Sequence, residues 1–113
     1  MVTPTRTWTT QVLESSLPIN FAASGDNVIV PAVAGKFSWM HRLFFIVTAA
    51  TSITVKDGIG GAALTGPLPF SAGGDMVLDD SGDAWFKTSA GNALVLDSLN
   101  AVQVSGTVWF IQQ

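Results

Sequence analysis

The sequence predicts an all-β protein, and three observations lead to this prediction. No stretch of a dozen residues repeats apolar side chains at spacings of three and four, the pattern of an amphipathic helix. Val, Ile, Phe, Trp and Thr, which are common in strands, dominate instead and occur in short runs. Gly, Pro, Asn or Asp ends these runs after a few residues, as in sandwiches and jelly rolls. We therefore expect an antiparallel, jelly-roll-like β-sandwich of about eight strands.

The length and the first residues define the expected domain organisation. A chain of 113 residues is long enough for one compact domain and too short for two. The opening sequence MVTPTRTWTT has no apolar periodicity, so residues 1–10 are predicted to form an N-terminal arm. Residues 11–113 are then expected to form a single β-sandwich domain.

Turn sequences divide this domain into its expected strands, since Gly, Pro, Asn and Asp favour turns over extended backbone. In chain order the turns are SGDN at 24–27, AGK at 34–36, KDGIGG at 56–61, TGP at 65–67, SAGGD at 71–75, DDSGD at 79–83, SAGN at 89–92 and LN at 99–100. The expected strands cover residues 10–22, 26–34, 36–48, 51–57, 68–70, 75–79, 84–89, 93–97 and 101–112.

The last expected strand, 101–112, alternates in the way of a strand with one buried face. Its apolar face carries Val102, Val104, Val108 and Phe110. Its polar face carries Gln103, Ser105 and Thr107, until Trp109 and Ile111 interrupt the pattern.

The strand expected at 36–48 differs because both of its faces carry large apolar side chains. Under strict alternation one face contains Phe37, Trp39, His41, Leu43, Phe45 and Val47, and the other contains Ser38, Met40, Arg42, Phe44, Ile46 and Thr48. A two-layer sandwich has a single core, so one of these faces needs a second cover. Either the N-terminal arm or a loop folds over it, or it is the interface with another subunit or partner.

The composition favours an interface. Only 12% of the residues are charged, which leaves few charges to cover the surface. Trp8, Trp109 and Ile111 are further apolar residues beyond what one core requires. We therefore expect an obligate oligomer whose interface residues are Trp8, Trp39, Phe44, Phe45, Ile46, Trp109 and Ile111.

Residues suited to catalysis or metal binding are few. The chain has one histidine, one glutamate, no cysteine and no tyrosine, so neither a catalytic triad nor a thiolate metal site is expected. His41 is interpreted as a partly buried, hydrogen-bonded structural residue.

GIGGAA at 58–63 matches a dinucleotide-binding pattern, but LTGPLPF follows where a helix is required, so a hairpin loop is expected. DDSGD lacks the glycine and glutamate positions of a calcium loop and is expected to be a solvated turn. The prediction is a non-enzymatic protein without a cofactor or metal.

Charge and hydropathy also limit the expected partners. The formal net charge is −3 and the five basic residues are scattered singly, so no nucleic-acid-binding surface is expected. The most apolar run, 43–55, contains four hydroxyl residues and is shorter than the about 20 residues that cross a bilayer. The start of the chain lacks the apolar segment of a secretory signal. No membrane partner is therefore expected.

Several sequence elements resemble those of small all-β proteins encoded among the virion genes of tailed phages. These elements are VPAVAGK at 30–36, LTGP at 64–67, a WF-x-T-x-x-G-x-A-L segment at 85–94 and AVQVSG at 101–106. The resemblance covers about residues 24–111 and departs from the group at Trp39, Met40 and His41. It implies a capsid decoration, or cement, protein on the outer surface of the virion. It also implies a homotrimer that binds the major capsid protein, and it carries over no catalytic or binding residue.

A second interpretation is a glycan- or receptor-binding jelly roll at a phage tail tip or fibre. Sugars stack on exposed aromatic rings, and Trp85, beside the acidic turn at 79–83, is the candidate ligand platform. The alternative for Trp85 is packing in the core, since Phe86 follows it on the opposite face.

Overall fold

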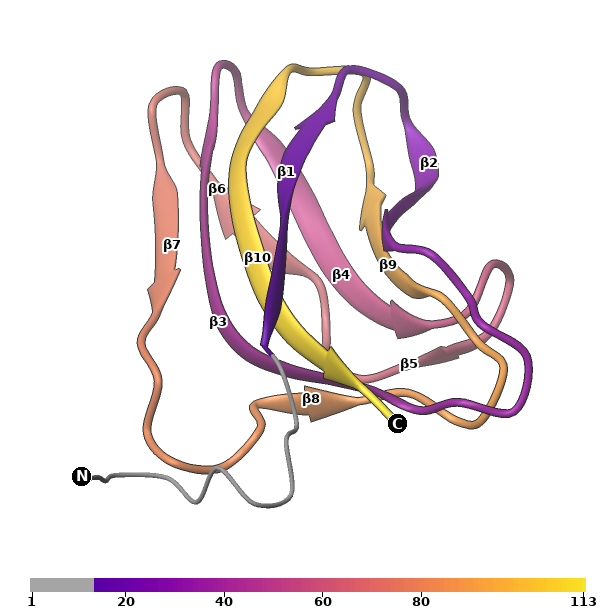
Figure 1. Ribbon diagram of the computed structural model, residues 1–113. Coiled ribbons are helices and arrows are strands. Elements are labelled where there is room, and N and C mark those ends of the chain that lie inside the picture. Colours follow the sequence, from indigo (N-terminus) through magenta and orange to yellow (C-terminus); the bar gives the residue numbers. More distant parts are fainter. Residues whose placement is uncertain (1–13) are drawn as a thin grey trace, which may run out of the picture.

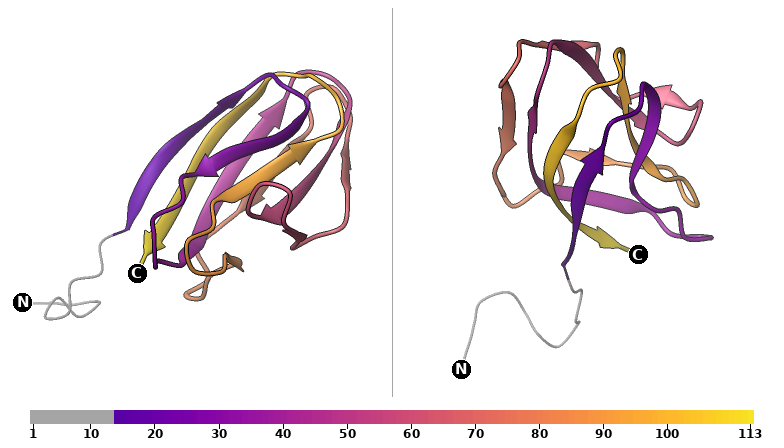
Figure 2. Two further views of the ribbon diagram at one scale, coloured as in Figure 1. Left: turned by 90° about the vertical axis from the view of Figure 1, so that its right-hand side faces the viewer. Right: turned by 90° about the horizontal axis from the view of Figure 1, so that it is seen from above.

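Two antiparallel sheets pack face to face in the computed structural model, which describes residues 14–113 (Figures 1 and 2). The first sheet has the order β1-β10-β3-β7, with β8 also paired to β3; the second has the order β2-β9-β4-β5, with β6 also paired to β4. Strands of the first sheet are β1 (Ser15–Phe21), β3 (Ser38–Val47), β7 (Asp75–Leu78), β8 (Phe86–Lys87) and β10 (Val104–Gln112). Strands of the second are β2 (Gly25–Val30), β4 (Thr51–Asp57), β5 (Ala62–Ala63), β6 (Leu68–Phe70) and β9 (Leu94–Ser98).

Successive long strands alternate between the two sheets, which is the arrangement of a jelly roll. The chain passes from β1 to β2 to β3 to β4 by changing sheet each time, and β9 and β10 also lie in opposite sheets (Figure 2). The predicted jelly-roll-like sandwich is therefore confirmed. The structure has ten strands where about eight were expected; nine of them overlap the expected ranges, and the two-residue strand β5 is the addition, within the predicted glycine-rich loop. Among residues 14–113 no helix is long and apolar enough to cross a membrane.

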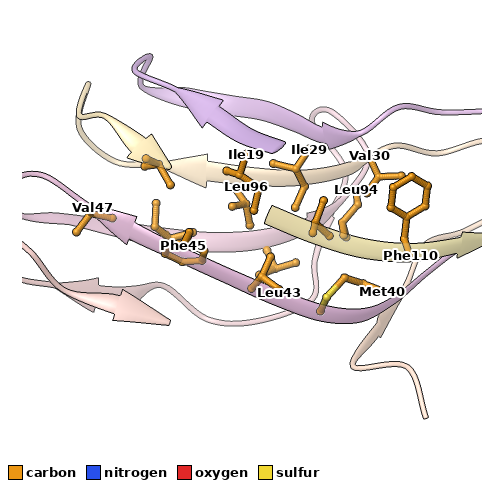
Figure 3. Packing of buried hydrophobic residues seen from close by; sticks show 14 of the residues in the cluster. Ile19, Ile29, Val30, Met40, Leu43, Phe45, Val47, Leu94, Leu96 and Phe110 are labelled. Carbon is orange, nitrogen blue, oxygen red and sulfur yellow. The ribbon is translucent and has the colours of Figure 1, made fainter. Parts of the chain in front are cut away.

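The single hydrophobic core lies between the two sheets (Figure 3). It is built from the inward faces of the long strands, and its fully buried members include Ile19, Phe45, Val47, Ile53, Leu94, Leu96, Val104 and Val108. Phe45 has no exposed surface and packs edge-to-face on Phe70, with 5.3 Å between the ring centroids. The prediction that Phe45 belongs to an interface is wrong, because this side chain points into the core.

A β-bulge in β3 decides which of its residues face inward. Trp109 pairs with Arg42 and Phe110 pairs with Met40, so His41 is an extra residue with no counterpart in β10. A bulge of this kind shifts the alternation by one position. Met40 is therefore buried on one side of the bulge, and odd-numbered residues such as Phe45 are buried on the other side. Strict alternation over 36–48 had placed Trp39 on the same face as Phe45, and the bulge is the reason that this was wrong.

Two carboxylates fasten loops to the second sheet. Asp26 accepts hydrogen bonds from Lys56 Nζ at 2.9 and 3.0 Å and from the Gly60 amide at 2.6 Å. The Lys56 hydrogen bonds, with the Gly60 amide, lower the pKa of Asp26, and the same contact raises the pKa of Lys56. The glycine-rich segment 58–63 is thus held as a hairpin loop, whose end pairs with β4, as predicted.

Asp57, at the end of β4, holds the loop that precedes β9. It accepts hydrogen bonds from the Ser89 amide at 2.9 Å, the Ser89 hydroxyl at 2.7 Å and the Asn92 side chain at 3.1 Å. Burial raises the pKa of Asp57, but the bonds from Ser89 and Asn92 together outweigh it, so the net pKa is lowered. Deprotonated Asp57 is therefore part of the folded structure.

Candidate functional site

The outward surface of the first sheet carries an apolar patch, which we call the outer apolar face. It faces the viewer in Figure 1, across β7, β3 and β10. The outer apolar face consists of Trp39, Phe44, Ile46, Val77, Trp109 and Ile111. A contiguous exposed patch of this kind is uncommon on a protein that works alone and is typical of a contact surface.

Strand pairing brings these six side chains together. Phe44 of β3 lies opposite Val77 of β7, and Trp39 of β3 lies opposite Ile111 of β10. The rings of Phe44 and Trp109 are 6.1 Å apart between centroids. Phe44 is 43% exposed and Val77 is 60% exposed, so the centre of the face is open to solvent. These contacts within the sheet leave Phe44, Ile46 and Val77 exposed, whereas Trp39, Trp109 and Ile111 are partly buried.

Two cations lie on the aromatic rings of this surface. The Arg42 guanidinium lies 4.5 Å from the centre of the Trp109 ring. Lys87 Nζ lies 4.5 Å from the Phe37 ring and 4.7 Å from the Trp39 ring. Cation–π contacts hold a charge over an apolar surface without neutralising it. Two cations therefore lie at the end of the outer apolar face where Trp39 and Trp109 are found.

Neither Arg42 nor Lys87 forms an ion pair within residues 14–113, so both cations are available to a partner. Within residues 14–113 the ion pairs are made by Lys56, with Asp26 at 2.9 Å and Asp97 at 3.8 Å. Arg42 and Lys87 have no carboxylate within this distance among the described residues. The indole N–H of Trp39 is also buried without a hydrogen-bond acceptor in this part of the chain. This end of the face therefore contains polar groups that the described fold does not satisfy.

Most of the predicted interface residues meet on this face. Five of them do so: Trp39, Phe44, Ile46, Trp109 and Ile111. Phe45 is in the core, and Trp8 lies outside the described residues. Sequence reasoning missed Val77, Arg42 and Lys87 as members or neighbours of the patch. The four-residue strand β7 is too short for a clear alternation, and its pairing with β3 has no local sequence signal.

His41 is half-buried at the bulge of β3, which agrees with a structural residue in its strand. The hydrogen bonds found among residues 14–113 do not include its ring, in contrast to the expectation of a hydrogen-bonded side chain.

The turn DDSGD at 79–83 is closed by one of its own side chains, because Asp80 accepts a hydrogen bond from the Gly82 amide at 2.9 Å and forms an Asx turn. No group of three or more His, Asp or Glu residues within 14–113 is placed to hold a metal ion.

Trp85 lies on the surface next to this turn. Its ring is 45% exposed, and its indole N–H donates to the Asp79 carbonyl at 2.7 Å. The alternative that Trp85 packs in the core is wrong, whereas its neighbour Phe86 does pack against the core. Because one hydrogen bond holds the exposed indole ring of Trp85 in place, Trp85 is a second candidate contact residue.

A shallow depression of about 330 Å³ lies on the outward surface of the second sheet. It is lined by Ser52, Thr54, Pro67, Asp97 and Leu99. Leu99 is 70% exposed, and Asp97 Oδ2 lies 3.8 Å from Lys56 Nζ. This depression has no sequence-predicted residue and no cluster of reactive groups, so the outer apolar face is the stronger candidate.

The fold and this surface define an all-β sandwich of jelly-roll type with a large unpartnered apolar face. No protein-family model matches the chain, and no curated protein matches it significantly. Among solved structures the chain is similar to a protein from Bacillus endospore appendages, described as a novel family of disulfide-linked pili. The identity is 13%, the alignment covers 97% of this chain and 96% of the other, and the TM-score is 0.45.

Proposed function

We propose that this chain is a non-enzymatic structural protein of a tailed-phage virion. In this proposal it binds the outer surface of the capsid as a homo-oligomer and stabilises the shell. The observation that carries the proposal is the outer apolar face, where Phe44, Ile46 and Val77 are 43%, 47% and 60% exposed. The sequence elements that resemble phage virion proteins support the choice of partner.

The physical requirements of a cement protein agree with these features. Such a protein performs no chemistry and instead adds interface free energy between neighbouring capsid subunits. A few large side chains at the centre of an interface supply most of that energy, and Trp and Tyr are enriched among them. Trp39, Trp109 and Phe44 are side chains of this kind. A jelly-roll sandwich holds them on a rigid sheet, so little entropy is lost when they are buried.

The number of copies is proposed from the resemblance, which implies a trimer. A symmetric shell offers many equivalent sites, so each copy needs only a modest affinity. Burial of the outer apolar face within the oligomer, or between the oligomer and the shell, would remove it from water. Either arrangement accounts for an apolar surface on a chain with so few charges.

The test measures attachment to capsids directly. Purified chain is mixed with capsids of the encoding phage that lack it, and bound chain is quantified after sedimentation. We expect saturable binding and a higher melting temperature of the shell. Val77→Ser should weaken binding or assembly, whereas Leu99→Ser, at a 70% exposed residue that follows β9 of the other sheet, should not. Absence of binding to such capsids by the folded wild-type chain would refute the proposal.

The second candidate function is glycan or receptor binding through Trp85. The specific observation in its favour is the 45% exposed ring, oriented by the hydrogen bond to the Asp79 carbonyl. Aromatic rings held in this way stack on the apolar faces of sugars. A glycan array probed with the wild-type chain and with Trp85→Ala tests this function. Binding that is lost in Trp85→Ala would support it, and no binding by either chain would contradict it.

A further inference from the structure

We infer that the outer apolar face binds a second copy of this chain through that copy's acidic edge. The acidic edge is the exposed segment 75–83, which comprises β7 and the turn after it and contains Asp75, Asp79, Asp80 and Asp83. This inference depends on the homo-oligomer of the proposed function. It adds which two surfaces are in contact, and which charged residues fix their relative position.

The size of the face suits a stable interface. The longest strand of the sheet, β3, has 10 residues. Three strands about 4.8 Å apart and up to about 33 Å long outline at most roughly 480 Å². A standard interface takes roughly 800 Å² from each partner, so the face supplies more than half of that area. An interface area of this size involves many side chains and not one exposed residue alone.

Charge complementarity selects the acidic edge as the occupant. Arg42 and Lys87 lie on the aromatic rings of the face and have no carboxylate partner among residues 14–113. The acidic edge has four exposed carboxylates and no cation of its own. Ion pairs between a cationic patch and an acidic one orient partners and suppress wrong registers. The chain therefore has both halves of an electrostatic contact on different parts of its own surface.

Apolar groups reinforce this match. Trp85 follows the acidic edge and is 45% exposed. Its ring can be buried against the aromatic rings of the neighbouring copy. The ion pairs then lie beside apolar contacts, where the lower local dielectric strengthens them.

Val77 is shared by the two surfaces, but the cations of the face and the carboxylates of the acidic edge are different residues. In a heterologous contact each copy uses its cations toward one neighbour and its carboxylates toward another, and such contacts either close into a ring or continue as a filament. A closed ring of three copies agrees with the trimer implied by the resemblance. A two-fold dimer would instead bury the same surface on both copies.

The experiment uses two reversed-charge variants of the whole chain. Arg42→Glu/Lys87→Glu changes the face, and Asp79→Lys/Asp83→Lys changes the acidic edge while Asp80, which closes the turn, is kept. Native mass spectrometry and sedimentation velocity measure association of each variant alone and of their mixture. Each variant alone should associate at least tenfold more weakly than the wild type. The mixture should form species containing both variants, because a contact between the two different variants again joins opposite charges.

Circular dichroism and thermal melts establish that each variant is folded. If a reversed-charge variant is not folded, Arg42→Gln/Lys87→Gln replaces it and should still weaken association severalfold. Association as strong as that of the wild type in either variant alone, or no mixed species in the mixture, would overturn the inference.

Capsid sedimentation separates this inference from the proposed function. An oligomer that obeys the charge rule but does not bind capsids refutes only the function, and a capsid-binding oligomer whose association is unchanged by the charge reversals refutes only the inference.

Discussion

Phe44 and Phe45 are adjacent in β3 and provide an internal comparison between the outer apolar face and the core. Phe45 has no exposed surface, whereas Phe44 is 43% exposed. Replacing each in turn by Ala removes the same atoms from two different environments. We therefore expect Phe45→Ala to affect the folding of one copy, and Phe44→Ala to affect association between copies.

The magnitudes follow from burial. Loss of a fully buried Phe costs about 3–5 kcal/mol, and the edge-to-face contact with Phe70 places Phe45 in the upper part of that range. Domains of this size have about 5–15 kcal/mol of stability, so the loss is a large fraction of the total. The melting temperature should fall by on the order of 20 °C. Phe44→Ala leaves no internal cavity and should cost the isolated chain about 1 kcal/mol.

The assay is urea unfolding followed by tryptophan fluorescence at several chain concentrations. Association makes apparent stability depend on concentration. The wild type and Phe45→Ala should keep this dependence, and Phe44→Ala should lose it. Equal losses of stability for both variants at low concentration would refute the reasoning. That result would mean that Phe44 is covered within its own chain.

Three further predictions concern backbone packing, pH and the lone histidine. A Cβ at Gly106 would lie 1.9 Å from the Phe44 carbonyl oxygen, so Gly106→Ala should cost at least about 2 kcal/mol in urea unfolding, and Ser105→Ala should cost little. The folded pKa values of Asp26 and Asp57 are lowered, so both carboxylates bind protons less tightly in the folded state. Their contribution to stability is complete above about pH 4 and is lost as the pH falls through the lowered values, and thermal melts from pH 2 to 7 should show this decline. A melting temperature that is constant over this range would contradict it. His41→Gln should change the melting temperature by only a few degrees, because the ring is half-buried at a bulge; a loss similar to that of Phe45→Ala would show a larger role.

The strand class and the turns were determined by the sequence because both depend on neighbouring residues. Gly, Pro, Asn and Asp mark turns through their own backbone preferences, and short runs of β-branched and aromatic residues mark strands between them. The expected strands 51–57 and 68–70 agree with β4 and β6 of the structure. The presence of a surplus apolar surface was also predicted, since it depends only on which residues the strands contain.

The membership of that surface was decided by the tertiary structure. The bulge at His41 exists because β3 and β10 pair with unequal numbers of residues, and at the bulge this pairing joins Phe110 to Met40, 70 positions apart in the sequence. Before the bulge is known, Phe45 cannot be distinguished from Phe44 as the exposed residue. Val77 joins the face only through the pairing of β7 with β3. Alternation along one strand shows that two faces exist, but contacts between distant strands decide which face is buried, because the core forms where the two sheets meet.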